Sequence, residues 1–115
     1  MTHYRFLVES RPLSGMEDEY HQWYDGRHSA DLLTLPGARQ VQRFRTIGSA
    51  TDVPTFFMIV DYETDDLAGL LATIRTRAQS AGMPSSDALD PASVKVTILE
   101  ARGPARRHPG ETICR

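Results

Sequence analysis

The sequence predicts an α+β fold, a ferredoxin-like βαββαβ sandwich. Four runs of residues carry the alternating or continuous apolar pattern of strands, and two longer runs repeat apolar residues at helical spacing. Glycine and proline separate these runs into the order strand, helix, strand, strand, helix, strand. In a chain of 115 residues, the right-handed crossover rule leaves the ferredoxin-like topology as the common solution for that order.

The N-terminal half supplies a strand, a helix and a second strand. Residues 3–9, HYRFLVE, alternate with a period of two and predict the first strand. The first helix is expected to start near Gly15 and to weaken around Gly26, because glycine costs about 1 kcal/mol relative to alanine in a helix interior. A Pro-Gly pair ends this helix, and residues 38–47 alternate again as the second strand.

The C-terminal half repeats the arrangement with a plainer helix. Residues 48–54 are rich in turn formers and predict a hairpin connection. Residues 55–63, TFFMIVDYE, are apolar almost throughout, which predicts a central strand buried on both faces. Apolar residues then recur at helical spacing over residues 67–78, in a helix expected to end at Gly82. Residues 94–101 form the last alternating run.

The predicted topology leaves one face of the sheet without a cover. Residues 1–102 are expected to form a single domain, and residues 103–115 a C-terminal tail that is disordered or crosses to a partner subunit. Two helices cover one sheet face, so the other face, with residues such as Phe57 and Ile59 or their alternates, is exposed. Large apolar faces rarely stay in water. We therefore expect a homodimer in which two subunits pair their sheets into a dimeric α/β barrel.

Composition argues against several classes of protein. A net charge of −2, with scattered basic residues, does not fit a nucleic-acid-binding face. No apolar run approaches the roughly 20 residues of a membrane span, and the N-terminus lacks the pattern of a secretory signal. The single cysteine, Cys114, suits a reducing compartment. We therefore expect a cytoplasmic protein that binds a small molecule and has no membrane partner.

The segment that follows Glu19 concentrates aromatic and titratable side chains. A helix built only for packing more usually carries Leu, Ile or Ala at its core-facing positions. Here Tyr24 and His28 lie one turn apart, beside a stripe of large side chains. That stripe consists of Met16, Tyr20, Trp23, Arg27 and Asp31. The segment therefore predicts a helix that closes a small pocket.

The run WYDGRHSADLLTLPGARQVQRF resembles the EthD-like branch of the dimeric α/β-barrel superfamily. Members commonly read W-Y-D-x-x-H, an aliphatic-proline pair, an acidic residue, aliphatic residues and P-G, followed by a strand that ends in Arg-Phe or Arg-Tyr. The matching positions are Trp23, Tyr24, Asp25, His28, Asp31, Leu32, Leu33, Pro36, Gly37, Arg43 and Phe44. Ser29 and Ala30 replace the usual aliphatic-proline pair, and Gly26 stands where many relatives carry a charged residue. The resemblance implies small homodimeric enzymes with a reactive pocket between the sheet and the first helix.

Acid–base chemistry is the predicted activity of this pocket. His28 is expected to move a proton, Tyr24 to polarise or protonate a substrate oxygen, and Asp25 to hold the imidazole. The residues expected to form the substrate pocket are Tyr20, Trp23, Arg27, Arg43 and Phe57. The structural alternative makes Asp25 and His28 a clamp at the helix end, and the aromatic residues part of the core.

The predicted function is a cofactor-independent dehydratase, cyclase or isomerase that acts on an aromatic or polyketide-like small molecule. The alternatives are a cofactor-independent monooxygenase on the same fold and a non-catalytic dimeric ligand-binding protein. No metal is expected, because the face that carries His21, Asp25 and His28 is the predicted solvent side. No haem is expected either, since the second helix contains no histidine, and there is no glycine-rich phosphate loop.

Overall fold

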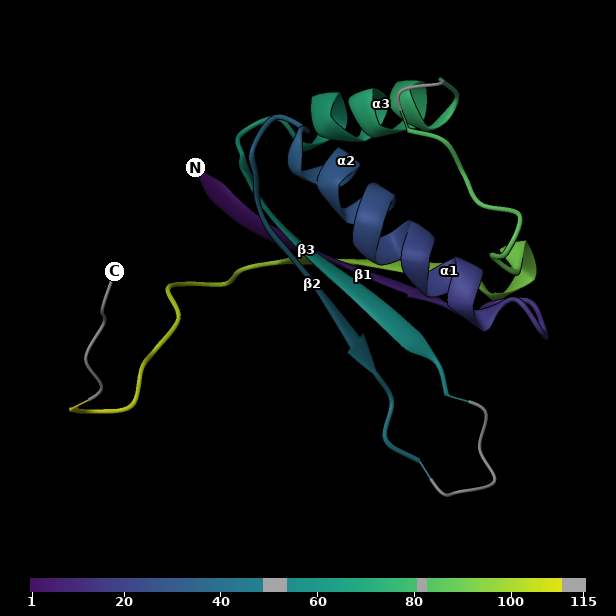
Figure 1. Cartoon of the computed structure of the whole chain (residues 1–115). Coiled ribbons are helices and arrows are strands. Elements are labelled where there is room, and N and C mark those ends of the chain that lie inside the picture. The colour runs from purple at the N-terminus through teal and green to yellow at the C-terminus, as the bar shows by residue number, and fades with distance from the viewer. Residues whose placement is uncertain (49–53, 81–82, 111–115) are drawn as a thin grey trace.

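A four-stranded antiparallel sheet forms the base of the molecule (Figure 1). The computed structural model describes residues 1–48, 54–80 and 83–110. The strands are β1 (Thr2–Ser10), β2 (Ala38–Arg45), β3 (Phe56–Thr64) and β4 (Lys95–Glu100), and their order in the sheet is β2-β3-β1-β4. The most apolar strand, β3, is central, as its sequence predicted.

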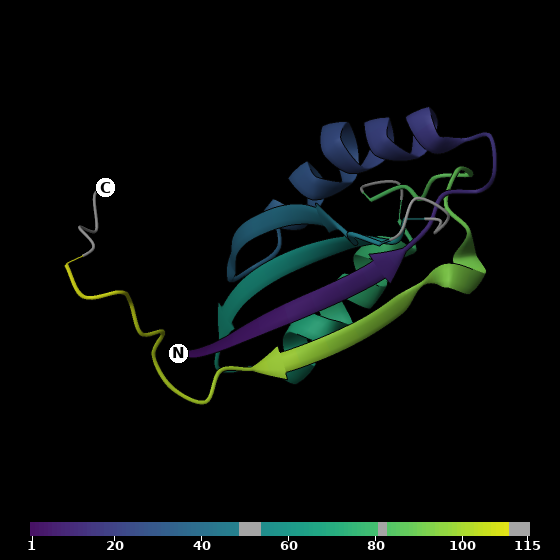
Figure 2. The ribbon, with the colours of Figure 1, turned by 90° about the horizontal axis from the view of Figure 1, so that it is seen from below.

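The helices lie on one face of this sheet (Figures 1 and 2). The first helical segment consists of α1 (Glu17–Trp23), the π-helical turn η1 (Tyr24–His28) and α2 (Ser29–Leu33), which follow one another without a break. The second helix, α3 (Leu67–Ala78), starts at the N-cap Asp66, whose carboxylate accepts the Gly69 N–H at 2.9 Å. A short 3-10 turn, η2 (Pro91–Ser93), precedes β4. The prediction of a ferredoxin-like βαββαβ fold is confirmed.

The core lies between the sheet and the helices. Because side chains alternate along a strand, the residues of β1 and β3 that face the helices are every second one. Phe6 pairs with Val60 and Val8 with Met58, so these four share the helix side. The buried apolar residues are Phe6, Tyr20, Tyr24, Leu32, Leu35, Met58, Val60, Tyr62, Leu70, Met83 and Ala88.

The opposite sheet face carries apolar side chains that no described element covers. Phe57 and Ile59 alternate with Met58 and Val60 and therefore point away from the helices. Leu99 of β4 lies on the same side and is 46% exposed. The sequence-based expectation of an uncovered face holds for the described part of a single chain.

The C-terminal residues leave the body of the domain. Residues 103–110 have no regular structure and extend away from the sheet beyond β4 (Figures 1 and 2). The remainder of the predicted tail, with Cys114, lies outside the described residues, as do most of the predicted hairpin connection and the predicted helix stop at Gly82.

Candidate functional site

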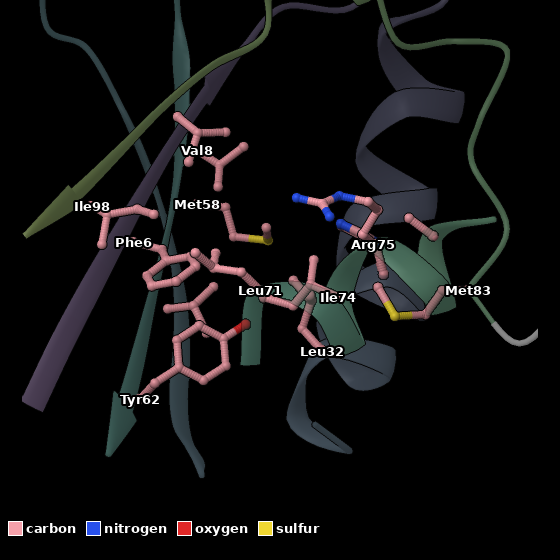
Figure 3. A pocket seen from close by; sticks show the side chains of 14 residues that line it. Phe6, Val8, Leu32, Met58, Tyr62, Leu71, Ile74, Arg75, Met83 and Ile98 are labelled. Atoms are coloured by element: carbon pink, nitrogen blue, oxygen red, sulfur yellow. The ribbon is translucent and has the colours of Figure 1, made fainter. Parts of the chain in front are cut away.

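An apolar cavity of about 370 Å³ lies between the sheet and the helices (Figure 3). Strands β1, β3 and β4 form its floor, while η1, α2 and α3 contribute to its other walls. Its lining consists of Phe6, Val8, His28, Leu32, Met58, Val60, Tyr62, Leu71, Ile74, Arg75, Ala78, Met83, Val96 and Ile98. Cavities of this size and character are the usual sites of small organic ligands.

Only three of the lining side chains carry polar groups: His28, Tyr62 and Arg75. Burial raises the pKa of Tyr62 to about 12, so its phenol is neutral at physiological pH. A ligand in this cavity therefore meets mostly hydrocarbon, with few groups available to fix its orientation.

His28 reaches the cavity from a π-helical turn. A π turn holds one more residue than an α turn, so the residues that follow are displaced by about 100° around the helix axis. His28 and Leu32 are four residues apart, and both line the cavity. Sequence analysis predicted a weakened helix at Gly26, and this glycine lies in the middle of the π turn. A Cβ at Gly26 would have nothing within 4 Å among the described residues, so no close neighbour requires the glycine.

The imidazole of His28 has aromatic neighbours and an unpaired nitrogen. Its ring stacks on Trp23, with centroids 4.4 Å apart and planes inclined by 17°, and meets Tyr24 edge-on at 5.5 Å. Nδ1 is buried and has no hydrogen-bond partner among the described residues. Burial lowers the pKa of His28 to about 4, although the nearby Asp31 carboxylate opposes that shift. The ring is therefore neutral at physiological pH, whereas an unperturbed imidazole, with a pKa near 6.5, would be partly protonated.

Tyr20 and Tyr24 belong to a buried hydrogen-bonded cluster beside the cavity. The Ser10 hydroxyl on β1 lies 2.6 Å from the Tyr20 hydroxyl and 3.0 Å from the Tyr24 hydroxyl. Burial raises the pKa of Tyr24. Neither tyrosine is among the residues that line the cavity. Their hydroxyls face β1, which differs from the predicted position of the Tyr24 hydroxyl at a substrate oxygen.

Asp25 contacts an arginine rather than the histidine that it was predicted to orient. Its Oδ1 accepts a hydrogen bond from Arg43 Nη1 at 3.0 Å, and the same nitrogen lies 3.1 Å from His21 Nδ1. Arg43 also places its guanidinium over the Tyr24 ring, 4.6 Å from the centroid. The reason is tertiary: β2 brings the guanidinium of Arg43 to Asp25 and to the Tyr24 ring, so Asp25 pairs there while His28 lines the cavity.

The other predicted pocket residues do not line the cavity. Trp23 supports the His28 ring and donates from Nε1 to the Pro84 carbonyl at 3.0 Å. Arg27 forms an exposed i, i+4 ion pair with Asp31 at 2.8 Å. Phe57 lies on the far face of the sheet, so the expectation that it shapes the pocket is corrected: its neighbour Met58 does. In a strand that is apolar on both faces, alternation alone cannot assign the sides.

Sequence reasoning missed the contribution of α3. Leu71, Arg75 and Ala78 line the cavity at positions i, i+4 and i+7 of this helix. Helical spacing places Arg75 on the stripe of apolar residues, and that was the signal that could have revealed it.

Metal ligands and membrane-spanning helices are not found in the part of the chain that the structure describes. Among these residues, no three His, Cys, Asp or Glu side chains gather in a way that could hold a metal ion. His21 and Asp25 lie against Arg43, whereas His28 faces the cavity. No described helix combines the length and apolarity needed to cross a bilayer.

Structural comparison places this arrangement among known folds. The haem-degrading protein MhuD from Mycobacterium tuberculosis, solved with two haems in its active site, is similar with a TM-score of 0.60 and 14% identity over 90% of this chain and 99% of that one. An EthD family protein from Bacillus halodurans is similar with a TM-score of 0.56 and 15% identity, over 88% of this chain and 99% of that one. A Bacillus cereus protein described as a putative antibiotic-biosynthesis monooxygenase has a TM-score of 0.56 and 8% identity, over 93% of this chain and 97% of that one. The chain has the ferredoxin-like fold of the dimeric α/β-barrel proteins.

These similarities concern the fold, since the sequences have diverged widely. No family model matches the chain, and a search of curated proteins finds no match. Nonetheless, the EthD-like resemblance of the sequence and the structural similarity to an EthD family protein agree on the fold. Function therefore has to be argued from the cavity.

Proposed function

We propose that this chain is an enzyme of the monooxygenase type that acts on a small, largely apolar molecule in the cavity between the sheet and the helices. The observation that carries the proposal is a neutral imidazole, His28, in the wall of an otherwise apolar cavity of about 370 Å³. The structural neighbours that include a haem-degrading protein and one described as a monooxygenase support this reaction class over lyase chemistry.

The protonation state of His28 also favours oxygenation over dehydration. Dehydration needs an acid that protonates the departing hydroxyl, in addition to a base. His28, with a pKa of about 4, is unprotonated at neutral pH, and the Tyr24 hydroxyl is bound to Ser10. Oxygenation of a carbanion needs only a proton acceptor at the outset. The described cavity lining supplies that acceptor and no carboxylic acid.

The reaction balances without an external reductant. An activated CH₂ carbon of the substrate loses a proton to His28, and the resulting carbanion transfers its electrons to O₂. The carbon becomes a carbonyl, and the second oxygen atom leaves as water, so CH₂ plus O₂ gives C=O plus H₂O. A base with a pKa of about 4 is weak, so the substrate C–H must itself be acidic. The anion that forms beside the ring then favours imidazolium.

Haem is no part of this proposal. Two of the similar structures hold a porphyrin. The α3 residues that line the present cavity are Leu71, Ile74, Arg75 and Ala78, none of which ligates iron. The one imidazole in the lining comes from η1, and Trp23 covers a face of its ring. We therefore assign no step of the reaction to a bound haem.

Anthrone provides a direct test, because its methylene is activated by a carbonyl and its oxidation gives a quinone. Purified protein should consume O₂ with anthrone faster than buffer alone, and isotopically labelled O₂ should place one labelled atom in the product. His28→Ala should lower turnover at least about a hundredfold in a folded protein. A loss under threefold would remove His28 from the chemistry. Conversion of substrate without uptake of oxygen would support the lyase or isomerase alternative instead.

We further propose that the active form is a homodimer joined through the uncovered sheet face. Leu7, Phe57, Ile59 and Leu99 lie on that face in the single chain. Residues 103–110 extend away from their own domain, which leaves them free to contact a second subunit. Burial of this face in a twofold pair removes its apolar side chains from water.

A further inference from the structure

Arg75 is a charged side chain in a wall that is otherwise nearly all hydrocarbon. It lies on α3 between residues that line the same cavity, Leu71 and Ala78. Figure 3 shows its side chain extending from the helix across the cavity toward the strands, on the side of Val8 and Met58. No hydrogen bond or ion pair joins Arg75 to another described residue, whereas Arg77 on the same helix donates to the Thr34 hydroxyl at 2.8 Å.

An arginine that has no partner among the described residues and lies over an apolar cavity is suited to an anionic ligand. Its guanidinium presents a planar set of N–H donors that matches both oxygens of a carboxylate. None of the fourteen residues that line the cavity is acidic, so the described lining offers no internal partner for the charge. The hydrocarbon around it favours a ligand whose remaining surface is apolar.

We propose that the cavity selects an amphipathic carboxylate: a flat apolar body that fills the space above the sheet, and one carboxylate group that pairs with Arg75. Because Arg75 and His28 line the same cavity, a ligand held at its carboxylate presents its apolar body to the imidazole. Arg75 thus determines specificity and orientation. This inference rests on the proposed function, since it takes the same cavity to be the ligand site.

Binding of two matched probes tests the inference. Calorimetric titration of the whole chain with 2-naphthoic acid and with 2-naphthamide, both at neutral pH, compares a carboxylate with a neutral analogue of nearly the same shape. The acid should bind at least about fivefold more tightly, since the ion pair is partly exposed to solvent. Arg75→Gln should abolish this preference and leave the affinity for the amide unchanged. Arg75→Lys should restore part of it.

Arg77→Gln is the matched control, because it removes one positive charge from the same helix outside the cavity lining. It should leave the preference intact. Equal binding of both probes to the wild type, or an equal loss in the two variants, would overturn the role of Arg75 while the cavity remained a ligand site. Failure of both probes to bind would overturn the inference together with the proposed ligand site.

Discussion

At the scale of single residues, His28 has a partly buried ring whose Nδ1 is fully buried and has no partner among the described residues. A buried polar atom without a hydrogen bond costs on the order of 1–3 kcal/mol, and such atoms are rare in native proteins. The two carboxylates nearest to it in the sequence, Asp25 and Asp31, pair with Arg43 and Arg27 instead. The unpaired nitrogen leaves a neutral imidazole available to a ligand and lowers the stability of the folded protein.

The stability of the protein should depend on His28 as the pH falls. Its pKa is about 4 in the folded chain and near 6.5 in the unfolded one, so between these values the unfolded state binds a proton that the folded state does not. Stability should therefore decrease from about pH 6.5 to pH 4, by on the order of 2 kcal/mol from this group. Urea denaturation of wild type and His28→Gln over this range measures the difference. A constant difference between the two proteins would contradict the prediction, and His108→Gln in the exposed tail is the control.

The Ser10 hydroxyl should contribute more to stability than either tyrosine hydroxyl that it contacts. Tyr24→Phe removes one buried hydrogen bond and should cost about 1 kcal/mol of unfolding free energy. Ser10→Ala removes the hydroxyl that both Tyr20 and Tyr24 contact and should cost about 2–3 kcal/mol. Chemical denaturation of both variants gives the comparison. A larger loss of stability for Tyr24→Phe would contradict this ranking. A loss of turnover without a loss of stability would return Tyr24 to the catalytic role first predicted.

At the scale of elements, the π-helical turn sets which residues of the first helical segment face the cavity. The glycine in this turn is exposed, has no crowded neighbour in the described structure and does not adopt a positive φ. Gly37, at the end of the same segment, is also exposed but differs in the other two respects: its φ is +83°, and a Cβ there would collide with the Glu63 carbonyl.

Alanine at these two glycines should therefore have opposite effects. Gly26→Ala should stabilise the protein by about 0.5–1 kcal/mol, since alanine is the better helix former and restricts the unfolded chain. Gly37→Ala should destabilise it by more than about 1 kcal/mol, because the left-handed conformation is strained and β3 would have to move. Thermal and urea denaturation measure both. Destabilisation by Gly26→Ala would mean that alanine is incompatible with the π turn.

At the scale of the whole molecule, one sheet face holds the cavity, and no described element covers the other. The helices cover the first face, and the second carries Phe44 and Leu99, which are 45% and 46% exposed. Burial of such side chains stabilises an interface by roughly 25 cal/mol per Å² of apolar surface removed from water.

A charge on the uncovered face should dissociate the dimer. Leu99→Glu places a carboxylate in the proposed interface without disturbing the core of the single chain, since Leu99 is exposed there. Sedimentation analysis should show a shift from dimer to monomer. Leu33→Glu, at an equally exposed position on α2, is the matched control and should leave the dimer intact. A monomeric wild type would refute the proposed interface.

Much of the fold followed from the sequence because it is encoded in local patterns. Each of these patterns indicates that one segment buries an apolar face against the core. They are the alternation in residues 3–9 and 38–47, the apolar run at residues 55–63 and the helical spacing over residues 67–78. Together with the crossover rule, these patterns left one common topology, and the structure has it. A position of His28 at a pocket was also expected from the sequence, since an imidazole within an aromatic helix face is a local signal, and His28 does line the cavity.

The partners of the site residues were decided only by the tertiary structure. The register of β2 and β3 put Arg43 beside Asp25 and turned Phe57 away from the cavity, and the packing of α3 brought Arg75 to it. These contacts join residues that are distant in the sequence, so no local period encodes them. The pKa of His28 follows the same logic, because burial by surrounding elements, rather than its sequence neighbours, removes the ring from water.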